Sequence, residues 1–148
     1  MMGMTPIPEI EIISVATIDQ LCDCLPKRRK YFTLLLAVDA VDVDEERLMT
    51  LFRPLVCRGL AYFCVWGKGC SAVHDAVDLC VVLNEIDHGE AGYLLMTTWY
   101  EDVPLVDSLW TFKMIAIPAE CDVFGSFDRF AVAVGNAEWA ESMRLSLQ

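Results

Sequence analysis

Four short apolar runs, separated by stretches of helical length, constrain the fold of this chain more than any other feature. They occupy residues 31–38, 60–66, 93–99 and 128–134. Each run is too short for a typical helix, and a continuous apolar run of this length is typical of a strand that is buried on both faces. Such strands occur in parallel sheets that are covered by helices on each side. The runs therefore predict an α/β fold.

The segment after the first run predicts a helix that packs on this sheet. Its apolar residues recur at helical spacing over 48–56, which gives one apolar stripe. We expect Asp42 as the N-cap, because Glu45 follows three residues later as in a capping box. Pro54 lies within the pattern, and its missing N–H group is expected to kink or shorten the helix.

Further helices are expected between the later runs and after the last one. One is capped by Ser71, although residues 79–83 are β-branched enough to form a strand instead. Another starts near Pro104, and a last helix covers 137–147. Strand and helix thus alternate through one domain, residues 1–148. We expect a three-layer sandwich with a four- or five-stranded, mainly parallel sheet, Rossmann-like or flavodoxin-like.

The first thirty residues are interpreted as an N-terminal extension or edge element of that domain. Residues 9–14 alternate like an edge strand, and Thr17 is a suitable cap for a short helix over 18–25. The basic cluster 27–30 follows, with four Lys or Arg side chains in a row. We expect this cluster to pair with carboxylates of the domain itself, and anion binding is the alternative.

The charge balance limits the partners that the chain can take. The sequence has 22 acidic and 11 basic residues, which gives a net charge of −11. Repulsion between like charges makes nucleic acid and anionic membranes unexpected partners, whereas a basic protein partner fits this charge. The alternative is that the charge only keeps an apolar-rich protein in solution. Hydrophobic residues make up 55% of the chain, more than one core readily buries. We therefore expect either a sheet that is covered on both faces or an apolar contact surface, with a homodimer as one use of that surface.

Cysteine usage and the N-terminal sequence both favour the cytoplasm. The seven cysteines are odd in number and lie mostly in apolar stretches, as reduced thiols do. No Lys or Arg occurs in residues 1–23, so the start lacks the basic region of a signal peptide. Cys22 and Cys24 have no second Cys or His cluster to complete a zinc site. We expect no metal and no cofactor.

Polar and glycine residues follow the predicted strands, and they define a candidate ligand site. In open parallel sheets, ligands bind beyond the carboxyl ends of the strands. The candidate ligand-binding residues at this edge are Asp39, Asp42, Gly67, Lys68, Gly69, Ser71, Thr97 and Thr98.

Two groups within this set suggest specific ligands. The loop from Gly67 to Ser71 has two glycines, the cation of Lys68 and a helix start, which suit a phosphate or carboxylate. The alternative is a tight turn that requires glycine. Asp39, Asp42 and Asp44 suit Mg²⁺ or acid–base chemistry, and the alternative is that Asp42 and Asp44 are caps for the next helix.

No catalytic set emerges from the sequence. Cys70 lies at an expected helix start, where a thiolate is stabilised, and His74 follows one turn later. This spacing is compatible with a Cys–His enzyme, but His74 is more simply interpreted as part of the solvated helix face.

One stretch of the chain resembles a known family. Thr97-Thr-Trp99, the acidic pair Glu101-Asp102 and Leu109-Trp110-x-Phe112 resemble a stretch of small uncharacterised bacterial α/β domains. The resemblance covers the third predicted strand and its helix, and it implies no known activity. We expect Trp99 to plug the core or to form the floor of a pocket.

These observations predict an acidic, cytoplasmic protein-binding module without catalytic activity, such as an adaptor, inhibitor or immunity-type protein. The alternative is a domain that binds a nucleotide or phosphorylated small molecule at the carboxyl edge of the sheet, with hydrolase activity as an option. A purely structural subunit of a larger assembly is the remaining interpretation.

Overall fold

A single parallel β-sheet forms the centre of the molecule. The computed structural model describes residues 7–89, 94–117 and 127–148. The five strands lie in the order β1-β5-β2-β3-β4, and every pairing between neighbours is parallel. Their bounds are β1 (Ile10–Val15), β2 (Phe32–Ala37), β3 (Leu60–Trp66), β4 (Met96–Tyr100) and β5 (Asp128–Val134).

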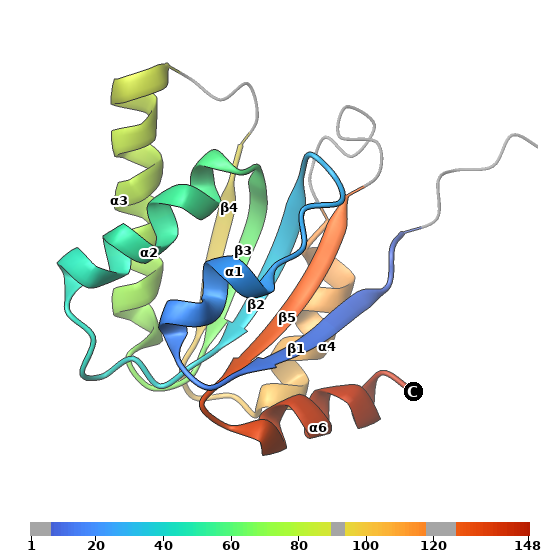
Figure 1. Ribbon diagram of the computed structural model, residues 1–148. Coiled ribbons are helices and arrows are strands. Elements are labelled where there is room, and N and C mark those ends of the chain that lie inside the picture. The colour runs from blue at the N-terminus through green and yellow to red at the C-terminus, as the bar shows by residue number, and fades with distance from the viewer. Residues whose placement is uncertain (1–6, 90–93, 118–126) are drawn as a thin grey trace, which may run out of the picture.

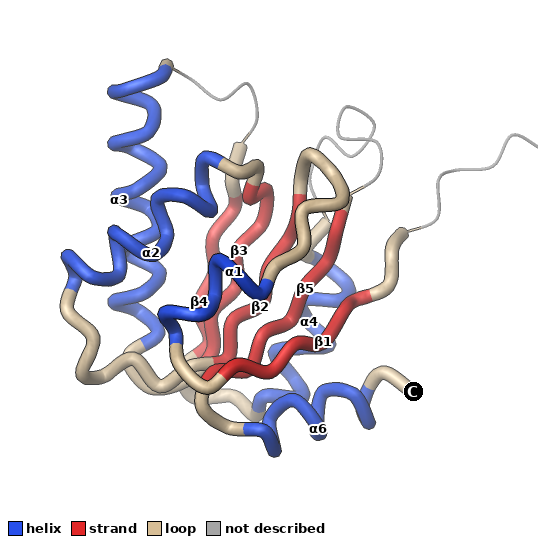
Figure 2. Tube along the Cα trace, in the orientation of Figure 1, coloured by secondary structure: helices blue, strands red, loops and turns tan. Residues whose placement is uncertain are grey.

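Helices cover both faces of the sheet, which confirms the predicted three-layer α/β sandwich of the Rossmann-like type (Figures 1 and 2). One face carries η1 (Ile18–Gln20), α1 (Leu21–Cys24), α2 (Glu45–Cys57) and α3 (Cys70–His88). The other face carries α4 (Leu105–Ile115) and α6 (Ala137–Ser146).

The core has two halves because alternate side chains of each strand point to opposite faces. In β2, Leu34 and Leu36 pack under α2 and α3, whereas Leu35 packs under α4 and α6. All three are fully buried, as the continuous apolar run predicts. On the α4 and α6 face, β5 presents Ala131 and Ala133, whose small side chains let the helices approach the sheet closely.

The start of α2 differs from the prediction. Its N-cap is Asp44, whose Oδ1 atom accepts a hydrogen bond of 2.8 Å from the Arg47 N–H. Asp42 is exposed in the preceding turn. The helix also continues through Pro54 to Cys57, because Leu55 and Val56 beyond the proline are buried in the core.

The start of α3 also differs. Gly69 is the N-cap, with φ of +75°, and the helix begins at Cys70 rather than after Ser71. Residues 79–83 are helical and do not form a strand. Tertiary packing overrides their β-propensity, since Val77 and Cys80 continue the buried helical stripe.

The third predicted strand differs, because β4 spans Met96–Tyr100 and its residues are exposed or half-buried. Four other predictions agree with the structure. β1 is an edge strand paired with β5, Thr17 caps η1, Pro104 caps α4, and α6 ends at Ser146. The sequence also predicts that the helix after Pro104 ends at Pro118 and that a connector covers 119–126, and both lie outside the described residues. No helix in the described ranges is both long and apolar enough to cross a bilayer.

Candidate functional site

The carboxyl edge of the sheet has a crevice beside β5. The helices that follow β1 and β2 lie on one face, whereas α6, which follows β5, lies on the other. Because β5 lies between β1 and β2, the segment that follows β5 covers one face of the sheet and the segments that follow its two neighbours cover the other face. Such switch points are where open α/β sheets bind ligands.

The crevice has a volume of about 430 Å³, within the range of small-molecule sites. Its walls are mainly apolar, and Trp139 of α6 forms one of them. The polar side chains are those of Thr17, Asp39 and Asn136. Among the described residues, no Lys or Arg lines the crevice, so a phosphate group finds no basic side chain there.

The predicted glycine loop lies beside the crevice. Its glycines let the loop after β3 pack closely against the loop after β2. A Cβ atom on Gly67, whose φ is +124°, would lie 1.9 Å from the Val38 carbonyl oxygen. The Lys68 carbonyl oxygen accepts a 2.9 Å hydrogen bond from the Ala40 N–H. The space beside Gly67 is thus filled by main chain, as the tight-turn interpretation requires. The Lys68 side chain is exposed.

The three aspartates after β2 serve separate purposes. Asp39 borders the crevice, and its Oδ1 atom accepts a 3.3 Å hydrogen bond from the Val41 N–H. Asp42 is exposed, and Asp44 caps α2. Within the described ranges, no group of three or more His, Cys, Asp or Glu residues is placed to hold a metal ion.

The two predicted threonines lie in the middle of β4 and point to opposite faces of the sheet. The Thr97 hydroxyl lies 2.9 Å from His74 Nε2 and donates to Asp78 Oδ1 at 2.7 Å. The Thr98 hydroxyl donates to Cys64 Sγ at 3.1 Å. The structure therefore brings Asp39 to the crevice and the glycine loop beside it, but leaves both threonines away from the crevice.

Cys70 is buried in the core, whereas His74 contacts Trp99 and Asp75. Cys70 is fully buried, and burial raises the pKa of its thiol, which disfavours the nucleophilic thiolate. The His74 ring packs on Trp99 with 4.4 Å between ring centroids, and its Nδ1 atom lies 3.1 Å from Asp75 Oδ1. Since Thr97 donates its one hydroxyl proton to Asp78, His74 Nε2 is the donor toward Thr97. In this arrangement His74 is not a general base for Thr97.

The outer edge of the sheet carries an apolar surface, whose position was not predicted from the sequence. The surface, which we name the β4 edge patch, consists of Leu94, Met96, Trp99 and Val103, all of them exposed. β4 is the last strand of the sheet, and within the described residues it pairs with β3 alone. Trp99 is 48% exposed, so it neither plugs the core nor forms a pocket floor.

A signal for this edge is present in the third apolar run. The run contains two adjacent threonines, whereas the runs at 31–38 and 60–66 contain one and none, and polar residues within a run are typical of a strand that is not buried on both faces. Carboxylates surround the patch. Asp75 and Asp78 lie beside the His74 ring that contacts Trp99, and Glu101 and Asp102 directly follow β4.

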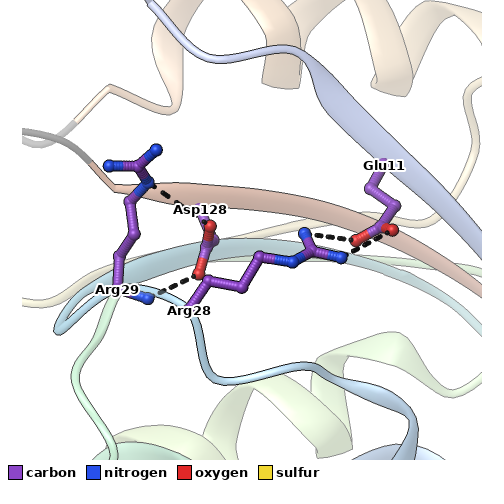
Figure 3. Close-up of polar contacts among 4 residues, drawn as sticks. All are labelled: Glu11, Arg28, Arg29 and Asp128. Carbon is purple, nitrogen blue, oxygen red and sulfur yellow. Dashed lines mark hydrogen bonds and ion pairs between the residues drawn. The ribbon is translucent and has the colours of Figure 1, made fainter.

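The basic cluster 27–30 pairs with carboxylates of the domain, as predicted (Figure 3). The Arg28 guanidinium donates two hydrogen bonds of 3.1 Å to the Glu11 carboxylate of β1. The Arg29 main-chain N–H donates to Asp128 Oδ2 at 3.1 Å, and its Nε atom lies 3.8 Å from Oδ1. These two arginines thus connect the segment before β2 to β1 and β5.

Comparison with known proteins yields one match. A family model described as "Domain of unknown function (DUF7684)" matches residues 10–145. No curated protein and no solved structure matches the chain. The predicted resemblance to an uncharacterised family is therefore confirmed, while its Thr-Thr-Trp and Leu-Trp-x-Phe motifs stay predictions.

Proposed function

The chain belongs to the DUF7684 family, whose description names no activity, and we propose that it is a non-catalytic protein-binding module that takes a basic partner at the β4 edge patch. The observation that carries the proposal is the half-exposed Trp99 on an edge strand, surrounded by carboxylates.

The apolar side chains of the patch favour contact with another protein. Met96 and Trp99 are 39% and 48% exposed, and they project from opposite faces of the same strand. Edge strands with exposed apolar side chains are sites where another chain can pair or pack. Trp is also among the residues that contribute most to binding energy at interfaces.

The carboxylates around the patch favour a partner with basic side chains. The side chains of Asp75 and Asp78 are 80% and 50% exposed, and Glu101 and Asp102 are exposed beyond the strand. With a net charge of −11, the protein presents carboxylates that favour contact with a basic partner and disfavour contact with a second copy of itself. This argues against a homodimer through the same edge.

Two further features support a non-catalytic role in the cytoplasm. The Cys70 thiol is buried, and the Thr97 hydroxyl, which contacts His74, donates its proton to Asp78. The described cysteines are all free thiols, which fits a reducing compartment.

Selection from a display library of short random peptides tests the proposal. We expect purified protein to enrich peptides that combine Lys or Arg with apolar residues. Trp99→Ala should weaken the selected peptides by about tenfold or more, since a central aromatic contact is lost. Trp110→Ala is the matched control, because Trp110 is 43% exposed but lies on α4, on the other face of the sheet. No enrichment, or equal losses in the two variants, would count against the proposal.

A second candidate is binding of a nucleotide or phosphorylated small molecule, with hydrolysis as an option. The crevice of about 430 Å³ at the switch point favours it. We expect a nucleotide to raise the unfolding temperature of the protein and Asp39→Ala to abolish that shift. The absence of a shift across a broad panel of nucleotides and sugar phosphates would eliminate this candidate.

A further inference from the structure

Arg129 of β5 is a buried cation near the amino-terminal end of the sheet. The residue is only 4% exposed. Its Nη2 atom donates to the main-chain carbonyls of Phe112 and Lys113 at 3.3 and 2.9 Å, and its Nη1 atom donates to the Pro8 carbonyl at 3.4 Å. Arg129 thus contacts the carbonyl end of α4, where a positive charge is stabilised by the helix dipole.

These contacts leave part of the guanidinium without a partner. A guanidinium has five N–H groups, and the three hydrogen bonds above use three of them. The Nε atom is buried and makes no hydrogen bond. A buried donor without an acceptor is costly, and native proteins rarely leave one unless a ligand or water supplies the acceptor.

No carboxylate of the described residues compensates the charge of Arg129. Asp128, the preceding residue in the strand, points to the opposite face of the sheet, where Arg29 binds it (Figure 3). Burial lowers the pKa of Arg129, which reflects the cost of keeping a charge there.

A pocket of about 460 Å³ lies against this cation. Arg129 is part of its lining, and Lys113 adds a second basic side chain. The walls are mainly apolar, with Ile10 of β1, Met114 of α4 and Leu147 after α6 among them. Glu9 is the acidic residue in the lining, and it is exposed.

We propose that this pocket binds an aliphatic monocarboxylate, whose carboxylate pairs with Arg129 and whose chain lies against Ile10, Met114 and Leu147. One buried guanidinium with free N–H groups matches one carboxylate, and the apolar walls match a hydrocarbon chain. The overall negative charge opposes an anion only weakly at this site, because charges beyond the Debye length of about 8 Å are screened.

The site is separate from the proposed protein-binding surface. The pocket lies beside β1 and β5, whereas β4 is at the other end of the sheet order. Ligand binding here adds a second activity to the protein, and its test does not depend on any protein partner.

Calorimetric titration of the full chain with octanoate, octanol and acetate tests the site. We expect octanoate to bind, octanol to bind at least about tenfold more weakly because it lacks the charge, and acetate not to bind because it lacks the chain. Equal affinity for octanoate and octanol would overturn the role of Arg129. No binding of octanoate would overturn the site as a whole.

Two further measurements keep the test independent of folding defects, since replacing Arg129 also removes a contact that stabilises α4. The Arg129 Nε–H resonance should shift on addition of octanoate and not on addition of acetate. Met114→Glu places a carboxylate in the pocket wall and should weaken octanoate binding about tenfold. Val82→Glu, an exposed substitution on α3, should leave binding unchanged. A resonance that does not shift, or equal effects of both substitutions, would contradict the proposal.

Discussion

Asp128 and Arg129 show how one strand places opposite charges on opposite faces of a buried sheet. Both are nearly buried, with exposed fractions of 8% and 4%. Asp128 is bound by Arg29 from the segment before β2, whereas Arg129 is bound by main-chain carbonyls at the end of α4. Neither charge neutralises the other, because consecutive residues of a strand point in opposite directions. Each therefore depends on contacts made by a different layer of the molecule.

The cysteines differ in reactivity for reasons that belong to single residues. Burial raises the pKa of the Cys64 thiol to about 12 and also raises the pKa values of Cys70 and Cys80. Cys57 is exposed. Because the thiolate is the reactive form, we expect iodoacetamide at about pH 8 to label Cys57 before Cys64, Cys70 and Cys80, and to leave these three buried thiols intact until the protein unfolds. Peptide mapping by mass spectrometry measures this order, and rapid labelling of Cys64 in the folded protein would contradict it.

At the scale of elements, α2 gives a direct comparison of two possible caps. Asp44→Ala removes the hydrogen bond from the Arg47 N–H and should lower the free energy of unfolding by about 1 kcal/mol. Asp42→Ala should leave stability within about 0.5 kcal/mol of the parent, because Asp42 is exposed in the turn. Urea unfolding monitored by circular dichroism distinguishes the two variants. Equal losses would mean that Asp42 shares the capping role.

The loop after β3 depends on glycine for space as well as for conformation. Gly67→Ala would bring a Cβ atom to 1.9 Å from the Val38 carbonyl oxygen, in addition to the strain of a φ of +124°. We expect a loss of more than about 3 kcal/mol in the free energy of unfolding. Gly89→Ala is the control, since its φ is +80° but no atom lies within 4 Å of its Cβ position. That variant should lose only about 1–2 kcal/mol, and a similar loss in both would show that the close loop contact is unimportant.

The elements were predictable from sequence where burial sets the pattern, and less so where local geometry does. The runs at 31–38, 60–66 and 128–134 became strands because continuous apolar sequence suits burial on both faces. The cap of α2 was misplaced because Asp42 and Asp44 are chemically equivalent, and only the turn between them decides which one reaches Arg47. The cap of α3 was misplaced because a glycine cap has no side-chain signal.

Only part of the candidate site was predicted from the sequence, because the rest depends on where the strands end and on their order in the sheet. The third run was expected to end at Trp99, which would put Thr97 and Thr98 near the carboxyl edge. The strand begins later and runs to Tyr100, so both threonines lie within β4. The crevice residues Gly135 and Asn136 directly follow the last predicted strand, but their position beside β1 depends on strand order. Strand order is a long-range property that periodicity does not encode.

At the scale of the whole molecule, the last strand completes the middle of the sheet. β5 lies between β1 and β2, and it pairs Ile10 near one end of the chain with Arg129 near the other. β1 has no other partner among the described strands. The alternating pattern of 9–14 and the apolar run of 130–134 agree with these edge and central places. The fold is therefore dominated by contacts between distant segments, which are slow to form.

This topology predicts that the chain does not fold before β5 is available. A fragment ending at residue 127 lacks β5 and α6, so β1 loses its partner and β2 loses one of its two. We expect this fragment to show no cooperative urea transition by circular dichroism. A fragment ending at residue 136 keeps all five strands and loses only α6, whose buried side chains are Ala140 and Met143. It should retain a weakened cooperative transition, since the sheet and the opposite helical layer remain. A cooperative transition in the shorter fragment would mean that β2, β3 and β4 with their helices form an independent folding unit and that β5 is added to a finished sheet.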